Sequence, residues 1–145
     1  MGKKMNFLAI ALLMLSADAW AQEHVGALKS VSGDVQIKRG DSFVEAHSGL
    51  QLMNSDLLIT RTKGYAGVIF TDGTTVTIGP DTEFNINSYT FEPGTEKYDF
   101  SMYLKKGSAV YNSGKIGKLS PGSVKLSTPR ATVGIRGTRF ILKVE

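Results

Sequence analysis

The run Ala66-Gly67-Val68-Ile69-Phe70-Thr71-Asp72-Gly73-Thr74-Thr75-Val76-Thr77-Ile78 decides the fold class of this chain. Two segments in which side chains alternate in polarity or size stand on either side of Asp72 and Gly73. Alternation with a period of two is typical of β-strands, and Asp-Gly is among the strongest short signals for the tight turn that joins two of them. The run therefore predicts a β-hairpin.

The register of this hairpin depends on how many residues form its loop. A two-residue loop would place apolar side chains opposite polar ones on each face. A three-residue loop over residues 71–73 instead sets Val68 opposite Val76, and one face becomes continuously apolar. The same register pairs Ala66 with Ile78, and the glycine of the loop supplies the positive φ that such a turn needs. A β-arc without direct pairing, as in solenoids, is the alternative.

Short runs with strand periodicity recur along the rest of the chain, separated by Gly, Pro and Asp turns. No segment after residue 22 keeps an amphipathic helical pattern for three turns. We expect one all-β domain of many short strands, built as a sandwich, a roll or a solenoid-like stack. The predicted strands are residues 31–38, 57–60, 65–70, 75–78, 83–86, 98–104, 108–111, 124–127 and 140–144. The predicted turns and loops are residues 79–82, 91–97, 105–107, 112–115 and 120–123.

The first 21 residues have the three parts of a secretory signal peptide. Two lysines precede an apolar run over residues 7–15, and small residues lead up to Ala21. Nine apolar residues fall well short of the roughly 20 that span a bilayer, which argues against a membrane anchor. We expect cleavage before Gln22. The chain would then consist of a signal peptide (1–21) and a periplasmic or secreted domain (22–145) without a membrane span.

Composition and charge narrow the classes of protein. Removal of residues 1–21 leaves 124 of the 145 residues, which is enough for one core. The chain has no cysteine, so disulfides and zinc–thiolate sites are excluded. Residues 22–101 carry six basic and 11 acidic residues, whereas residues 102–145 carry nine basic residues and one acidic residue. This asymmetry predicts a basic face for an anionic partner, unless interleaved strands mix the two halves in space.

Few residues in the sequence could carry catalysis or bind a cofactor. The two histidines, His24 and His47, have neither a metal-binding nor a triad spacing. Most aspartates adjoin Gly, Ser or Pro, as turn-forming carboxylates do. We therefore expect no enzyme activity, no cofactor, no metal site and no nucleic-acid partner.

The most distinctive segment is Thr128-Pro129-Arg130-Ala131-Thr132-Val133-Gly134-Ile135-Arg136-Gly137-Thr138-Arg139-Phe140. Its arginines offer planar donors for carboxylate or phosphate groups, and its glycines permit a close backbone approach or a positive φ. The candidate binding or structural residues are Arg130, Arg136, Arg139, Lys105 and Lys106. The candidate turn residues are Asp72, Gly73, Gly134 and Gly137.

Arg136 has two interpretations. In the first, it is buried and pairs with a turn aspartate, either Asp56 or Asp72, so that its role is structural. In the second, it is exposed and binds a ligand. The neighbouring glycines favour the first interpretation, because a tightly turned backbone can direct the side chain inward.

Four motifs resemble those of the FecR family of bacterial envelope domains, in the order of that family and over roughly residues 31–142. The last motif is the most specific of the four. Where the family usually has Gly-Asp, this chain has Ser55-Asp56, so a glycine-dependent turn is in question there. The four motifs are Gly33-Asp34-Val35 with Arg39-Gly40, Gly49-Leu50-Gln51-Leu52 with residues 56–60, residues 70–74 with 79–82, and residues 128–140.

The resemblance implies a role in envelope signalling. Well-known members are similar to anti-sigma regulators of iron uptake, whose periplasmic domain receives a signal from an outer-membrane receptor. We expect this chain to be a stand-alone exported form without the sigma-binding segment and transmembrane helix. The leading hypothesis is a module that binds another envelope protein through strand edges and loops. The alternative is a binding domain for cell-wall glycan or an anionic envelope polymer, which would use the basic C-terminal segment.

The signal peptide gives a direct prediction about processing. The mature protein recovered from cells is expected to begin at or next to Gln22, because the small residues before it suit a signal peptidase. Intact-mass measurement and N-terminal sequencing check this. Soluble, folded protein that retains Met1 would contradict it.

Overall fold

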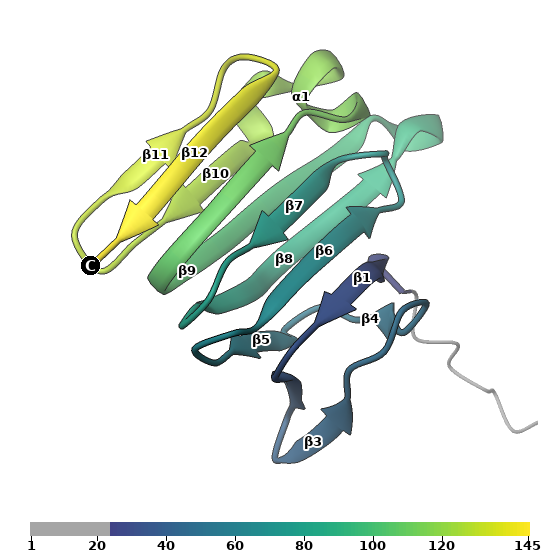
Figure 1. Ribbon diagram of the computed structural model, residues 1–145. Helices are drawn as coiled ribbons and strands as arrows, with labels where there is room; N and C mark the ends of the chain where they lie inside the picture. The colour runs from purple at the N-terminus through teal and green to yellow at the C-terminus, as the bar shows by residue number, and fades with distance from the viewer. Residues whose placement is uncertain (1–23) are drawn as a thin grey trace, which may run out of the picture.

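The structure is a computed structural model that describes residues 24–145, and the predicted signal peptide lies outside these residues. Of the described residues, 58% lie in strands, and their single α-helix, α1 (Lys115–Leu119), is short. The 12 strands form one curled, half-barrel sheet (Figure 1). The prediction of a single all-β domain is confirmed, and its architecture is a roll.

The strands vary from two to 16 residues in length. They are β1 (Gly26–Ser32), β2 (Val35–Arg39), β3 (Ser42–Glu45), β4 (Gln51–Leu52), β5 (Leu57–Thr60), β6 (Tyr65–Phe70), β7 (Thr75–Ile78), β8 (Glu83–Glu92), β9 (Lys97–Asn112), β10 (Val124–Ser127), β11 (Thr132–Gly134) and β12 (Arg139–Val144). Two 3₁₀ helices accompany them, η1 (Pro93–Thr95) and η2 (Pro121–Ser123).

The curl divides the sheet into two layers that face each other (Figure 1). In the first layer, the order of neighbours is β4, β1, β6, β7, the second half of β9 and β12. In the second layer, it is β3, β2, β5, β8, the first half of β9, β10 and β11. All pairs are antiparallel except β9 with β10. The strand β9 therefore belongs to both layers.

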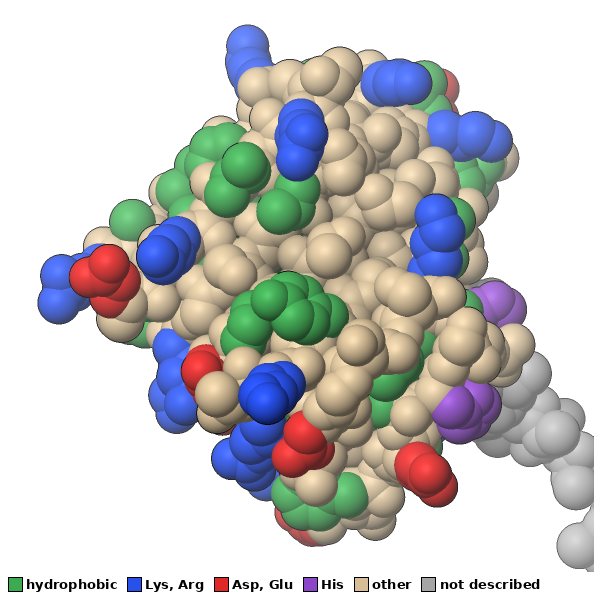
Figure 2. Space-filling model, viewed as in Figure 1, with side chains coloured by type: hydrophobic (Ala, Val, Ile, Leu, Met, Phe, Trp, Pro, Cys, Tyr) green, Lys and Arg blue, Asp and Glu red, His purple; other side chains and the backbone are tan. Residues whose placement is uncertain are grey.

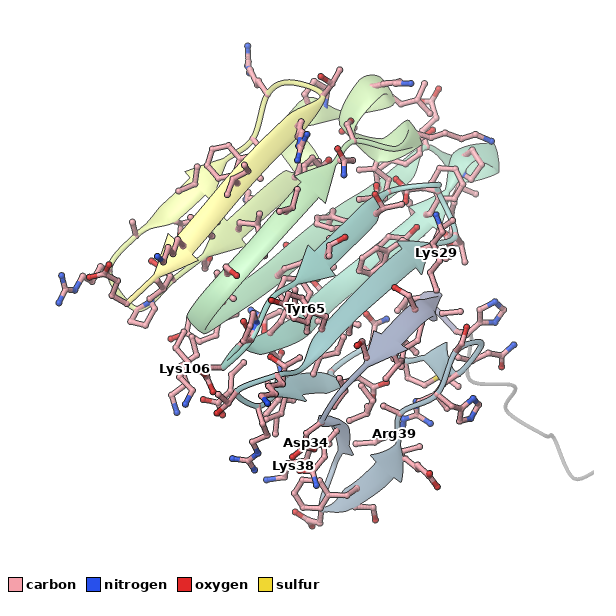
Figure 3. The ribbon with its side chains drawn as sticks, in the orientation of Figure 1. Lys29, Asp34, Lys38, Arg39, Tyr65 and Lys106 are labelled. Atoms are coloured by element: carbon pink, nitrogen blue, oxygen red, sulfur yellow. The ribbon has the colours of Figure 1, made fainter. Side chains whose placement is uncertain are left out.

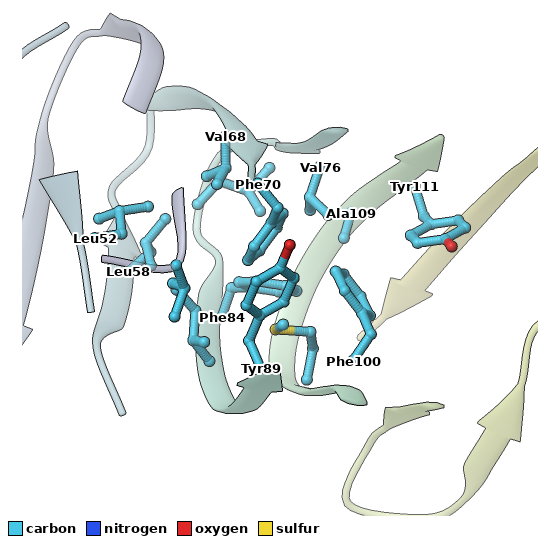
Figure 4. Packing of buried hydrophobic residues seen from close by; sticks show 14 of the residues in the cluster. Leu52, Leu58, Val68, Phe70, Val76, Phe84, Tyr89, Phe100, Ala109 and Tyr111 are labelled. Carbon is cyan, nitrogen blue, oxygen red and sulfur yellow. The ribbon is translucent and has the colours of Figure 1, made fainter. Parts of the chain in front are cut away.

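Aromatic side chains from the two layers form the centre of the core (Figure 4). The ring of Phe70 on β6 stacks on Tyr89 of β8 with centroids 5.1 Å apart, and meets Phe100 of β9 edge-on at 5.0 Å. Tyr111, further along β9, contacts the Phe100 ring at 5.5 Å. Such offset and edge-on pairs add stability beyond the area that they bury, so this cluster joins the two layers.

The hairpin predicted from residues 66–78 is present with the three-residue loop. Val68 pairs with Val76, and Ala66 pairs with Ile78. The amide of Phe70 donates to the carbonyl of Thr74 (2.8 Å), and Gly73 has a φ of 87°. The continuously apolar face thus decided the register, as expected from the alternation.

The predicted strand over residues 31–38 is wrong, because the chain bends in its middle. β1 ends at Ser32 and β2 begins at Val35, and the two strands lie in different layers. Gly33 has a φ of 71°, and a Cβ there would lie 2.1 Å from the carbonyl oxygen of Lys63. Alternation alone did not reveal the bend, since the polarity pattern continues through it.

The opposite error concerns residues 105–107, which were predicted to end a strand. β9 instead runs unbroken from Lys97 to Asn112 and passes from the second layer to the first near Gly107. Gly107 has a φ of 92°, which L side chains rarely adopt. The glycine therefore bends the strand without ending it.

Two buried threonines hold this bend. Thr82 Oγ1 accepts from the amide of Ser108 (3.1 Å) and donates to the carbonyl of Pro80 (3.0 Å). Thr60 Oγ1 donates to the carbonyl of Gly79 (2.6 Å) and accepts from the amide of Thr82 (3.0 Å). Side-chain hydroxyls thus satisfy the backbone groups that the bend takes out of the regular ladder. We call residues 79–82 with Thr60 and Gly107 the corner.

Other differences from the predicted elements are local. β8 extends to Glu92, beyond the expected end at residue 86, and the short strand β11 was not expected. α1 begins within the predicted turn at residues 112–115. The loop between β8 and β9 is exposed, as predicted. Ser55 has a φ of 72°, so the turn in which the family usually has glycine is kept here by a serine in the left-handed region.

The corner gives a prediction for stability. Gly107→Ala is expected to lower the free energy of unfolding by at least about 2 kcal/mol, because it forces a left-handed φ and a clash. A Cβ at Gly107 would lie 2.1 Å from Thr82 Oγ1. Gly122→Ala is the control, since a Cβ there meets nothing within 4 Å. Urea denaturation measures both, and equal midpoints would contradict the role given to the corner.

Candidate functional site

The basic residues singled out in the sequence lie in several places. Lys105 and Arg130 line the same groove. The Nζ of Lys106 lies 3.9 Å from the carboxylate of Glu83, in an ion pair exposed enough to contribute little to stability. Arg136 lines a separate depression of about 490 Å³. Arg139 is exposed at the start of β12. The five residues therefore do not form one basic site.

Lys105 and Arg130 lie in a groove that is open to solvent. Its volume is about 600 Å³, and it lies between the segment from β10 to β11 and the strand β12. Its basic lining residues are Lys105, Arg130 and Lys143, and its apolar lining includes Val133, Leu142 and Val144. We call it the edge groove. Glu145, the last residue, is the acidic side chain in its lining.

The strand β12 presents backbone groups beside this groove. Among the described strands, β12 pairs only with β9. The amide of Ser113 donates to the carbonyl of Thr138 (2.8 Å), which fixes the alternation of hydrogen-bonded pairs along the two strands. By that alternation, Arg139, Ile141 and Lys143 direct their N–H and C=O groups away from β9. The geometry can accept an additional strand.

The inner side of β12 has the apolar character of a strand that covers a core. Phe140, Leu142 and Val144 are half-buried and pack against the core cluster. Ile141 points outward and is 63% exposed. An added strand would cover the partly exposed ends of these side chains, so apolar burial and backbone hydrogen bonding would act together.

The expected pairing of Arg136 with Asp56 or Asp72 is wrong. Arg136 is exposed, and the partner of Asp56 is Arg39. The guanidinium donates from Nε to Oδ1 (3.0 Å) and from Nη2 to Oδ2 (2.9 Å), and Nη2 also donates to the carbonyl of Gln51 (2.9 Å). The hydrogen bond to Asp56 raises the pKa of Arg39. This bidentate pair joins β2 to the turn before β5.

Asp72 is a buried turn residue with more partners than its position in a hairpin loop suggested. Its carboxylate accepts from the amide of Thr74 (3.0 Å), the hydroxyl of Thr74 (2.7 Å), the hydroxyl of Tyr89 (3.2 Å) and the amide of Ile116 (3.0 Å). Burial raises the pKa of Tyr89, so its hydroxyl stays protonated and able to donate. Asp72 thus ties the hairpin loop to β8 and α1.

The candidate glycines serve the backbone in different ways. Gly73 lies in the hairpin loop with its positive φ. Gly134 ends β11, where a Cβ would meet nothing within 4 Å. Gly137 has a φ of 132° and lies in the connection between β11 and β12. This connection places the strand β12 on the first layer, opposite β11 on the second.

Sequence reasoning missed two features of the structure. One is the ion pair between Arg39 and Asp56, and the other is the place of Lys143 in the edge groove. The signal for Lys143 was present, because alternation over residues 140–144 predicts which side chains point outward. No local pattern links Arg39 to Asp56, which are 17 positions apart. Within residues 24–145, no group of three or more His, Asp or Glu could hold a metal ion, and no helix has the length and apolarity to cross a bilayer.

The two arginines give opposite predictions for stability. Arg39→Ala is expected to cost about 2 to 3 kcal/mol, below the range for a fully buried pair because Arg39 is itself partly exposed. Arg136→Ala, at an exposed site, is expected to change stability by less than about 0.5 kcal/mol. Urea melts of both variants beside the wild type measure this. A large loss for Arg136→Ala would restore the structural interpretation of that residue.

Comparison with known proteins identifies the family. Residues 56–145 match the family model described as FecR protein. The match begins at the aspartate that pairs with Arg39 and ends just after β12, at Glu145. Comparisons with curated proteins and with solved structures give no match. FecR domains are non-enzymatic signalling domains. Since the match covers more than half of the chain, the protein belongs to the FecR family.

Proposed function

We propose that this chain is an exported binding and signalling module of the bacterial envelope, which takes up an extended segment of another envelope protein along β12. FecR domains are typically periplasmic signalling modules. The observation that carries the proposal is the edge of β12 beside the edge groove, which pairs with no strand of residues 24–145. Strand addition to such an edge gives affinity through backbone hydrogen bonds and specificity through side-chain contacts.

The charge of the edge groove favours an acidic segment. Lys105, Arg130 and Lys143 stand along it, against the single carboxylate side chain of Glu145. Complementary charges speed association and fix the register of a bound strand. The incoming strand is therefore expected to combine apolar side chains, which face Leu142 and Val144, with Asp or Glu on the side of the basic residues.

The proposal of export rests on the predicted signal peptide. The signal peptide (1–21) would direct the domain (22–145) across the inner membrane, and the domain would act in the periplasm or outside the cell. The absence of cysteine suits an oxidising compartment, since no thiol has to be protected there. Envelope partners are the proteins that such a domain can meet.

The second candidate function is the binding of cell-wall glycan or an anionic envelope polymer in the same groove. The basic lining by Lys105 and Arg130 supports it. Polymer binding that depends on these charges weakens steeply as salt is raised, because screening acts on exposed charges. A strand held by backbone hydrogen bonds and apolar contacts depends much less on salt.

Ile141→Pro tests strand addition, because it removes an N–H that points to the free edge. Proline is tolerated on edge strands in such positions, so the pairing of β12 with β9 should survive. Binding of the envelope partner is expected to weaken at least tenfold, or about 1.4 kcal/mol. Pull-down from envelope extract identifies the partner, and titration of the purified pair measures affinity.

Ile141→Thr is the matched control, since it changes the same exposed side chain and keeps the N–H. It is expected to bind within about threefold of the wild type. Equal binding by the proline variant would exclude strand addition at β12. Loss of binding in high salt, together with retention of isolated cell wall by the wild type, would favour the polymer alternative instead.

A further inference from the structure

The strands of the first layer contain no Asp or Glu. This holds for β1, β4, β6, β7, β12 and residues 107–112 of β9. The acidic residues that lie in strands are Glu45, Glu83, Glu92 and Asp99, all in the second layer. We call the outward surface of the first layer the acid-free face. Figure 2 views it, and no red side chain appears in its middle.

The middle of the acid-free face is uncharged and partly apolar. Ile141 pairs with Val110, which pairs with Thr77, which pairs in turn with Gly67, so these four residues form one row across four strands. Ile69 lies one row away and is 39% exposed. Tyr65, at the other end of β6, is 51% exposed (Figure 3). Exposed apolar side chains gathered on one uncharged face of a sheet are typical of interaction sites.

The charged residues on the strands of this face stand at its two sides, and all are basic. Lys29 lies at the bulge of β1, and Arg139 and Lys143 lie on β12 (Figure 3 labels Lys29). Four steps between neighbouring strands, each about 4.8 Å, separate the two sides by about 19 Å. The strands of this face thus place cations on both sides of an uncharged centre, and the carboxylates that Figure 2 shows at its margin lie in the connections and the chain end beyond these strands.

We propose that the acid-free face is a docking surface for a folded envelope protein whose complementary surface has an apolar centre and an acidic rim. Protein interfaces have this anatomy: their cores are depleted of charge and enriched in apolar and aromatic side chains, and their rims are polar. Tyr65, Ile69 and Ile141 supply the centre, and Lys29, Arg139 and Lys143 supply the rim.

Charge argues against two other occupants. A second copy of this chain would bring basic rims together, because a two-fold interface uses the same patch on both subunits. An anionic polymer or lipid surface needs cations close together, whereas the two basic sides are separated by more than twice the screening length of about 8 Å. Thr77 and Ile69, in between, attract no anion.

The middle of the acid-free face lies away from the strand edge at β12. Thr77 lies on β7 and Ile69 on β6, which are separated from β12 by one or two strands. A protein on this face needs no backbone hydrogen bond from β12. A variant of the edge groove outside this face, such as Arg130→Glu, therefore leaves the face intact.

Photo-crosslinking in cells tests the proposal. The full chain is expressed with p-benzoyl-phenylalanine in place of Thr77, which is exposed in the middle of the face. We expect one adduct with a different protein, in which the cross-linked peptide lies near Asp or Glu residues. Ile69→Glu should reduce its yield at least tenfold, because it places a carboxylate in the apolar centre and against the acidic rim.

Two controls separate docking from folding and from strand addition. Leu119→Glu makes the same change at a residue of α1 that is 59% exposed and lies outside the face, and the adduct should persist. Arg130→Glu, which changes the charge of the edge groove outside this face, should also leave the adduct at the wild-type level within about threefold. Urea midpoints of Ile69→Glu and Leu119→Glu are expected to match the wild type, so a lost adduct reports on the surface.

Several outcomes would overturn the proposal. An adduct of twice the chain mass would assign the face to a second copy. A protease-resistant adduct with the cell wall, or cosedimentation of the purified chain with phosphatidylglycerol vesicles that Arg139→Glu abolishes, would assign it to a polymer or a lipid surface. The absence of any adduct, or equal yields from Ile69→Glu and the wild type, would show that the face is not a docking surface.

Discussion

The contact between Thr82 and Gly107 is the constraint on which the rest of the structure depends. β7 pairs with the second half of β9 and β8 with its first half, so the connection from β7 to β8 must change layer at the level where β9 does. β9 can bend there without ending because Gly107 accepts a left-handed φ and leaves room for Thr82 Oγ1. The hydroxyl of Thr82 then satisfies the amide of Ser108. If this contact is lost, the two layers no longer share a strand.

The bend also creates the edge groove. Since β9 lies in both layers, its far side supports β10 on the second layer and β12 on the first. These two strands diverge from a common neighbour, and the connection through Gly137 crosses from one layer to the other. The space left between them is lined by Lys105, which lies just before the bend, and by Leu142 on β12. The groove is thus a consequence of how one strand turns.

Features that depend on residues close together in the chain, such as the hairpin register, could be predicted from the sequence. Contacts between residues far apart in the chain could not. Val68 and Val76 could be paired because alternation and loop length are local properties. The bend at Gly33 was hidden, because the polarity pattern passes through it unchanged. Arg39 and Asp56 meet only after β2 and β5 pair, so charge patterning gave no means to choose Arg39 over Arg136. The basic residues were dispersed for the same reason, because β10 and β11 lie on the second layer and β12 lies on the first.

In the structure, the acidic residues 22–101 and the basic residues 102–145 do not form two separate halves. Their charges are not evenly mixed either. The strand topology places the acidic residues of the strands in the second layer. β1 comes from the acidic first part of the chain but carries Lys29 and no acid, and it joins β6 and β7, which carry no charge at all. β12 adds Arg139 and Lys143 at the opposite side. The acidic residues of β8 and β9 remain on the second layer. A chain of mixed composition thereby presents one face whose strands carry no carboxylate, and this separation is what gives the fold a surface that can discriminate among partners by charge.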